Sequence, residues 1–238
     1  VCGQCRYCQL EMPHHCLSRT VLGIQGRDGA FAEYLVLPEA NLHPVSNAIR
    51  DDVAVFTEPV ASAFRILEQV TVTEQERVIV LGDGKLGQLI AQVLWLNTKR
   101  LLCVGKHRWK LELLRRLNIP TAHVDDPIEP HADMVVDATG SLDGLEFALR
   151  LVRPEGTIVL KTTVAQAAQL HLATPAINEV RIIGSRCGPF RPALEALTLG
   201  TVEVRHLISE MYTLDDGEKA LKRASDPDVV KVLICMGR

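Results

Sequence analysis

The segment from Arg77 to Leu94 constrains the fold more than any other, because its apolar residues change period in the middle. The run from Val78 to Leu81 is short, aliphatic and typical of a strand that is buried on both faces. Apolar residues then recur at the spacing of a helix, at Leu86, Leu89, Ile90, Val93 and Leu94. The segment therefore predicts a buried strand followed directly by a helix.

Three glycines, Gly82, Gly84 and Gly87, lie between this strand and this helix in a G-x-G-x-x-G pattern. In a dinucleotide-binding loop the first permits a tight turn, the second lets the backbone approach a pyrophosphate, and the third lets helix and strand pack closely. Lys85 and Leu86 would then lie in the first helical turn, whose free N–H groups attract phosphate. We interpret the segment as a nucleotide-binding loop. An ordinary glycine-rich turn is the alternative.

Bulk composition narrows the class of protein. The 238 residues suffice for one large or two ordinary domains, and the 47% hydrophobic and 23% charged content is that of a globular protein. A net charge of -3 argues against nucleic acid or a membrane surface as the main partner. The apolar runs are too short and interrupted for a signal peptide or a spanning helix, so we expect a cytoplasmic setting.

Four of the seven cysteines crowd the first sixteen residues: Cys2, Cys5, Cys8 and Cys16. Four thiolates at C-x2-C-x2-C-x7-C spacing suit a closed tetrahedral site for structural zinc in a reducing compartment. An iron–sulfur site or a disulfide pair fits this spacing less well. The neighbouring His14 and His15 could replace a ligand, although the sequence favours their being exposed loop histidines.

The rest of the chain divides into three regions. Short strands are expected at 21–24 and 31–37, as part of a small β-barrel, and a helix over 53–70 that is interrupted at Glu58-Pro59. Strand and helix then alternate, which predicts a parallel sheet with helices on both faces. Its strands are expected at 78–81, 101–104, 121–124, 134–138, 157–160 and 181–184. A last helix over 192–199 and a strand over 229–236 follow, and that strand is expected to return to the first β region.

The residue at the end of the second strand bears on which dinucleotide binds. A fold for NAD places an acidic residue there against the ribose 2′-hydroxyl, whereas this chain has Gly105, followed by the basic run Lys106, His107, Arg108 and Lys110. A glycine leaves room for a 2′-phosphate and cations can pair with it. The sequence therefore predicts NADP(H) over NAD(H). A solvated basic start to the next helix is the alternative.

Taken together, these motifs resemble the zinc-containing medium-chain alcohol dehydrogenases, near the threonine and polyol dehydrogenases. The resemblance runs along the whole chain, and it rests on the four-cysteine lobe, Gly29–Tyr34, Glu58-Pro59, Gly82–Gly87, Val136–Gly140 and Gly184–Phe190. It implies an α/β fold with a doubly wound Rossmann sheet inserted in a partial GroES-like β-barrel catalytic domain. The expected boundaries are 1–58 for the partial GroES-like domain with its zinc lobe, 59–195 for the Rossmann NADP-binding domain, and 196–238 for a C-terminal segment that returns to the catalytic domain.

The resemblance also implies hydride transfer between an alcohol or polyol and NADP(H), with zinc as the Lewis acid on the alcohol oxygen. The family holds that catalytic zinc with ligands that precede the cysteine lobe, and of its neighbourhood only Glu58 is present here. We therefore expect an N-terminally truncated piece that binds cofactor and structural zinc without turning over alcohol. The nicotinamide half would lie near Thr139, Gly140, Thr162 and Ser185, with Lys161 and Arg186 either orienting ligands or solvated.

Two rival hypotheses belong to other classes. The chain could be a non-catalytic NADPH-binding module for redox sensing, or a nucleic-acid binder that uses the four cysteines as a zinc knuckle. The acidic balance weighs against the second. By analogy with the family we expect a homodimer or homotetramer, in which the edge strand at 181–184 pairs across a two-fold axis.

Overall fold

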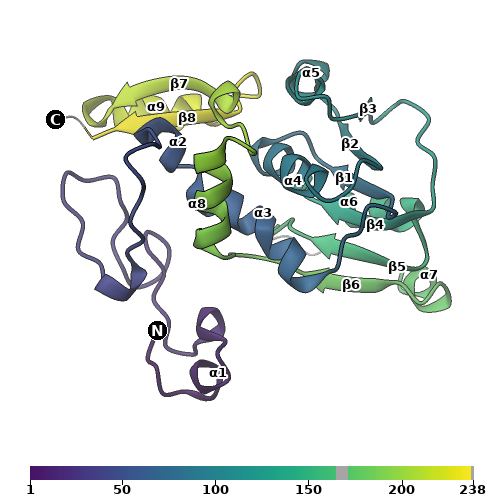
Figure 1. Cartoon of the computed structure of the whole chain (residues 1–238), viewed down its shortest axis with the longest axis horizontal. Coiled ribbons are helices and arrows are strands. Elements are labelled where there is room, and N and C mark those ends of the chain that lie inside the picture. Colours follow the sequence, from purple (N-terminus) through teal and green to yellow (C-terminus); the bar gives the residue numbers. More distant parts are fainter. Residues whose placement is uncertain (165–170, 237–238) are drawn as a thin grey trace. The chain divides into compact units, whose positions relative to one another are not determined.

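The computed structural model describes residues 1–164 and 171–236 and divides into two compact units (Figure 1). Unit 1 comprises residues 1–44 and 210–238, and unit 2 comprises residues 45–209. These boundaries differ from the expected ones at 58/59 and 195/196. The reason is that helix α3 (Thr57–Gln69) packs against both α4 (Lys85–Trp95) and α8 (Phe190–Leu199) within unit 2.

Unit 2 is built on six parallel strands in the order β3-β2-β1-β4-β5-β6. This is the predicted Rossmann sheet, and all six strands predicted for it are present. Because the order reverses between β1 and β4, a crevice opens at the carboxyl ends of these two strands. The strands are β1 (Val78–Leu81), β2 (Leu101–Gly105), β3 (Thr121–His123), β4 (Ala132–Asp137), β5 (Val152–Leu160) and β6 (Arg181–Gly184).

The core of unit 2 explains why these segments take these forms. All four residues of β1 are buried, as are the eight from Gly87 to Leu94 of α4. Each fully buried aliphatic side chain, such as Ile79 or Ile158, contributes about 1.5–3 kcal/mol of transfer free energy. The remaining helices of unit 2 are α2 (Asp51–Ala54), α5 (Arg108–Arg115), α6 (Gly144–Leu151), α7 (Ala173–Ile177) and the 3₁₀ turn Arg205–Leu207.

The helix expected over 53–70 breaks at a different place from the one predicted. Helix α2 ends at Ala54 and α3 begins at Thr57, so the break lies at Val55 and Phe56 and not at Glu58-Pro59. Pro59 is the third residue of α3. It is tolerated there because the first N–H groups of a helix have no intrahelical acceptor.

The strands predicted at 21–24 and 31–37 in unit 1 are not formed, and that prediction was wrong. The segment has only an isolated bridge between Val21 and Gln25. Ile24, Tyr34 and Val36 are 83%, 90% and 88% exposed. A strand needs a neighbour to accept its backbone hydrogen bonds, and no described strand pairs with this segment. Residues 1–44 carry the short helix α1 (Arg6–Gln9) and the 3₁₀ turns Pro13–His15 and Glu39–Asn41, which flank this segment.

The C-terminal part forms a two-stranded sheet from β7 (Ile208–Thr213) and β8 (Lys231–Cys235), with the 3₁₀ turn Leu214–Asp216 and helix α9 (Gly217–Arg223) between them. The tail strand predicted at 229–236 is thus confirmed, and it belongs to the same unit as residues 1–44. No described helix has the length and apolar character needed to cross a membrane.

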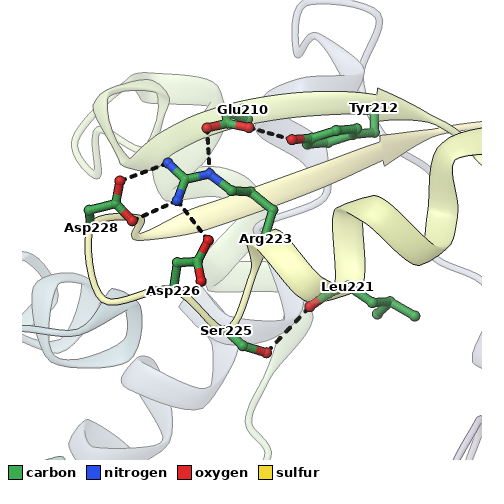
Figure 2. A network of polar contacts seen from close by, with 7 residues as sticks. All are labelled: Glu210, Tyr212, Leu221, Arg223, Ser225, Asp226 and Asp228. Atoms are coloured by element: carbon green, nitrogen blue, oxygen red, sulfur yellow. Dashed lines mark hydrogen bonds and ion pairs between the residues drawn. The ribbon is translucent and has the colours of Figure 1, made fainter.

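One arginine organises this C-terminal part (Figure 2). The guanidinium of Arg223 donates to Glu210 at 2.7 Å, to Asp226 at 2.9 Å and to both carboxylate oxygens of Asp228 at 2.6 and 2.8 Å. Hydrogen bonds from the Tyr212 hydroxyl and from Arg223 lower the pKa of Glu210. The network links the end of α9 to β7 and to the loop before β8.

Candidate functional site

The glycine loop has the geometry that its sequence predicts, with a different steric reason for each glycine. Gly82 has a φ of +115°, and a Cβ there would lie 2.5 Å from the carbonyl oxygen of Ala138. A Cβ on Gly87 would lie 2.0 Å from the carbonyl oxygen of Gly82, so α4 can approach β1 only with glycine here. Gly84, the N-cap of α4, has open space around its Cβ position.

A pocket of about 580 Å³ opens beside this loop, where the carboxyl ends of β1, β2 and β4 meet. This volume is within the usual range of ligand sites. Of the predicted cofactor residues, Gly82, Gly84, Gly105, Lys106, His107 and Thr139 line it. Lys85, Leu86, Gly87, Arg108, Gly140, Thr162 and Ser185 do not line it. The structure therefore brings the glycine loop and the end of β2 together around one cavity.

Asp83, which the sequence alone did not single out, lines the wall of this pocket. Its carboxylate is buried and accepts the backbone N–H of His107 at 2.6 Å and the ring Nδ1 of His107 at 3.0 Å. A Cβ on Gly105 would lie 2.4 Å from the Asp83 Cβ. Gly105 thus makes room for the Asp83 side chain. The signal that could have identified Asp83 is an acidic residue between the first two glycines of the loop.

The basic residues after β2 do not share one environment. Lys110 is only 7% exposed and lines the pocket. Arg108, at the start of α5, has a 70% exposed side chain that lies 4.0 Å from Asp126. The sequence grouped these cations together, whereas the helical turn separates them.

A second cluster forms where β4 and β5 end. The buried carboxylate of Asp137 accepts the N–H and hydroxyl of Thr139 at 3.0 and 2.8 Å, and the hydroxyl of Thr162 at 2.8 Å. The N–H of Gly140 donates to the Thr162 hydroxyl at 3.0 Å. A Cβ on Gly144 would lie 2.3 Å from the Thr139 hydroxyl oxygen, so α6 also packs tightly on the cluster. Three predicted residues, Thr139, Gly140 and Thr162, are therefore held together by Asp137.

Lys161 is buried, which excludes the solvated alternative that the sequence left open for it. It is 7% exposed, and its ammonium donates to the carbonyl oxygen of Ser62 in α3. Burial lowers the pKa of Lys161 to about 8, against the attraction of Cys187 and Glu58. The nearby Ser185 donates its N–H to Leu160 at 3.0 Å at the start of the turn after β6.

The four N-terminal cysteines converge in unit 1. Their Sγ atoms all lie within 4.8 Å of one another, and the Cys5–Cys8 and Cys2–Cys16 pairs are each 3.6 Å apart. A tetrahedral zinc with bonds of about 2.3 Å needs S···S separations of about 3.8 Å. All four are free thiols, so the disulfide alternative is not realised. The group does not include His14 or His15.

The backbone around these thiols favours ligation by thiolates. The N–H of Cys2 donates to the Cys16 sulfur at 3.3 Å, and backbone donors lower the pKa of Cys16 and bring that of Cys5 to about 6. Partial burial and the neighbouring thiols raise the pKa of Cys8 to about 11. A bound cation would replace this proton, since metal ligation deprotonates thiols.

Within residues 1–164 and 171–236, the four cysteines are the single group of three or more potential metal ligands. Glu58 lies in the first turn of α3 and is exposed. One carboxylate does not fit a catalytic zinc, which needs three protein ligands and an open position. The described residues thus fit one closed metal site and no second one.

Comparisons with known proteins agree with this architecture. Residues 1–47 match the model of the alcohol dehydrogenase GroES-like domain. A sorbitol dehydrogenase of Halalkalibacterium halodurans is 25% identical over 98% of this chain and 73% of its own length.

Solved structures show the same fold. A putative zinc-binding dehydrogenase from Sinorhizobium meliloti, solved with NADP, superposes with a TM-score of 0.88 at 23% identity, over 98% of this chain and 73% of its own. A short chain alcohol dehydrogenase from Escherichia coli CFT073, solved with NADH, superposes with a TM-score of 0.89 at 24% identity, over 99% of this chain and 74% of its own.

Proposed function

We propose that the chain is a member of the zinc-containing medium-chain alcohol dehydrogenase family, which it resembles, and that it is an oxidoreductase module that binds NADP(H) for hydride transfer with an alcohol or polyol. The observation that carries the proposal is the glycine loop. Gly82 and Gly87 have no room for a side chain, whereas Gly84 faces open space beside the pocket. This is the arrangement in which a pyrophosphate approaches a helix N-terminus.

The chain's own residues would hold the cofactor in two parts. The pyrophosphate would lie on the N–H groups at Gly84, Lys85 and Leu86 in the first turn of α4. The nicotinamide half would lie against the cluster that Asp137 organises, with Thr139 and Thr162 presented by β4 and β5. Gly87 would contribute by letting α4 pack closely against the end of β1. When bound, NADP(H) supplies the hydride acceptor or donor.

The preference for NADP(H) over NAD(H) rests on the end of β2. Position 105 is a glycine, the carboxylate beside it is that of Asp83, which accepts hydrogen bonds from His107, and Lys106, His107 and Lys110 line the adjoining pocket. One structural relative was solved with NADP and another with NADH. The dissociation constants of the two cofactors are therefore the test, and equal or tighter binding of NADH would contradict the preference.

We assign structural zinc to Cys2, Cys5, Cys8 and Cys16, whose sulfur separations suit a tetrahedral ion. The ion would stabilise a lobe in which Cys16 is the one buried ligand. Four thiolates that require reduction also support a cytoplasmic setting.

Alcohol turnover needs a catalytic zinc, for which the described residues offer only Glu58, so we expect them to bind cofactor without oxidising polyols. Because the described residues offer too few ligands for a catalytic zinc, a second candidate is a non-catalytic NADPH-binding module for redox sensing. One assay tests both candidates: purified protein is titrated with NADPH by fluorescence and then offered sorbitol and other polyols with NADP⁺. Absence of NADPH binding would refute both candidates. Turnover would show that the chain completes a catalytic site.

We further propose a homodimer or homotetramer assembled through β6. This strand is an edge of the six-stranded sheet and its residues are largely exposed. A second copy could continue the sheet there. Light scattering is the measurement, and a monomer at high concentration would contradict the proposal. A substitution of Ile182 by proline should shift an oligomer toward the monomer.

A further inference from the structure

A second cavity, of about 300 Å³, lies at the end of the six-stranded sheet opposite the glycine loop. Thr157 in its wall is in register with Met134, which pairs with Val78, the first residue of β1. The glycine loop follows the last residue of that strand, so the length of β1 separates the two sites. The cavity is therefore distinct from the crevice to which we assign the cofactor.

Strand register places two hydrogen-bond donors side by side in this cavity. Thr157 of β5 and Arg181 of β6 are direct partners in the parallel sheet, and both line the cavity. Side chains of paired residues leave the sheet on the same face, from strands about 4.8 Å apart. A hydroxyl and a guanidinium can thus reach the same bound group.

The protein leaves hydrogen-bonding capacity around this cavity unused. Thr157 is only 4% exposed, and its hydroxyl has no partner within residues 1–164 and 171–236. The Nε2 of Gln69, at the end of α3, donates to the carbonyl oxygen of Gly184 at 3.0 Å, and its buried Oε1 has no partner in the same part of the chain. Because buried polar groups are normally hydrogen-bonded, unsatisfied atoms beside one cavity point to a polar occupant.

The two arginines of the cavity are in different states. Arg153 donates from its Nε to Asp133 at 2.7 Å and from its Nη1 to the carbonyl oxygen of Pro154 at 2.8 Å. Arg181 is exposed, and its guanidinium has neither a carboxylate partner nor a hydrogen bond among the residues that the structure describes. Its planar fork of N–H groups is free to bind an oxyanion through two hydrogen bonds.

The carboxylates that line the cavity are already engaged. Asp133 accepts hydrogen bonds on both oxygens, from Arg153 and from the backbone N–H of Arg77 at 2.7 Å. Glu76 accepts the N–H of Thr73 at 3.2 Å. Because two arginines and two carboxylates balance in the lining, the site favours a ligand of low negative charge over a polyanion.

We propose that this cavity binds a small oxyanion, a carboxylate or a phosphate, between the Arg181 guanidinium and the Thr157 hydroxyl. Its volume is at the lower end of the range for ligand sites and suits a small molecule rather than a dinucleotide. The site goes beyond the proposed cofactor binding and does not depend on it.

The two sources of such an oxyanion are compared by titrating the ¹⁵N-labelled chain with inorganic phosphate and, separately, with acetate at constant ionic strength. We expect saturable shifts of the amide signals of Thr157 and Arg181 with at least one of the two probes. Saturation by one probe alone supports the site and identifies the preferred oxyanion. Saturation by neither, or shifts confined to the glycine loop at residues 84–86, would overturn the proposal.

Two variants assign the contacts. Arg181→Gln and Thr157→Val should each weaken binding of the probe at least about tenfold, the size of one charge-assisted hydrogen bond. Thr157→Val keeps the shape of the side chain and removes a hydroxyl without a protein partner among the described residues, so its Tm should equal or exceed that of the wild type. Loss of binding in such a variant is not a result of unfolding. Unchanged affinity in either variant would refute the assignment.

Arg116→Gln is the charge-matched control, because the Arg116 side chain is 72% exposed and does not line the cavity. It should bind the probe as the wild type does. An equal loss in this control would show general attraction of anions to a positive surface and would also overturn the proposal. NADPH binding, measured on the same samples, should be unchanged in Thr157→Val, which separates failure of this site from failure of the cofactor site.

Discussion

Two substitutions in the glycine loop, Gly84→Ala and Gly87→Ala, should have opposite consequences although both add the same methyl group. The structure gives them different neighbours. A Cβ on Gly87 would lie 2.0 Å from the carbonyl oxygen of Gly82, whereas a Cβ on Gly84 would meet no atom within 4 Å. We therefore expect Gly87→Ala to lose stability and Gly84→Ala to lose cofactor binding.

The cost at Gly87 can be estimated from that contact. To reach an ordinary separation of 3.4 Å the atoms must move apart by about 1.4 Å, and the obstacle is a backbone carbonyl that cannot rotate away. Overpacking of this kind costs about 1–3 kcal/mol, from which the better helix propensity of alanine recovers about 1 kcal/mol. The net loss of up to about 2 kcal/mol would lower the Tm of unit 2 by up to about 4–8 °C.

At Gly84 the added methyl group occupies the space through which a phosphate would approach. The N-cap substitution itself should change the free energy of unfolding by less than about 1 kcal/mol. Loss of one charge-assisted hydrogen bond, about 1.5–3 kcal/mol, would weaken NADPH binding by about 10- to 150-fold.

The assay is thermal unfolding with and without NADPH, combined with a fluorescence titration of each variant. Gly87→Ala should unfold at lower temperature even without ligand, and Gly84→Ala should lose mainly the stabilisation that NADPH provides. A Gly84→Ala protein that binds NADPH as tightly as the wild type, or a Gly87→Ala protein of unchanged Tm, would refute the reasoning.

Three further predictions follow from the other clusters. Metal analysis should find one zinc per chain, lost in Cys5→Ser and retained in Cys235→Ser; zinc retained in both would exclude the four-cysteine site. Because the pKa of Glu210 is lowered in the folded protein, its ionised carboxylate stabilises the fold fully above the ordinary glutamate pKa, and this stabilisation is lost as pH falls through the lowered pKa. In Arg223→Gln the free energy of unfolding should therefore fall less steeply with decreasing pH in the acid range. Lys161, with its pKa lowered to about 8, binds fewer protons when folded, so the free energy of unfolding should rise between about pH 8 and 10.5 and rise less in Lys161→Met; identical profiles would contradict its burial.

Much of unit 2 was predictable because its signals are local. The β-branched run at Val78, the change to helical period and the three glycines specify strand, turn and helix through short-range sterics. The repetition of that pattern along the chain then specifies a parallel sheet, since few topologies accommodate it. The cysteine spacing likewise indicated a metal site, because ligands a few residues apart can close around one ion without help from the rest of the fold.

The failures have one physical cause. The segments at 21–24 and 31–37 have the composition of strands, but a strand forms only where a neighbour accepts its backbone hydrogen bonds. Lys161 could not be told from a solvated cation, because its burial depends on α3, about a hundred residues earlier in the chain.

The sequence by itself determined a doubly wound sheet, a glycine loop of the kind that binds phosphate, and a cluster of four thiols. These features depend on residues that lie close together in the chain. Only the tertiary structure decided the environment of each charge. It placed Asp83 beside Gly105, separated Lys110 from Arg108, and gathered Thr139 and Thr162 around one carboxylate. Side-chain direction and burial are set by packing between distant segments, and no local pattern encodes them.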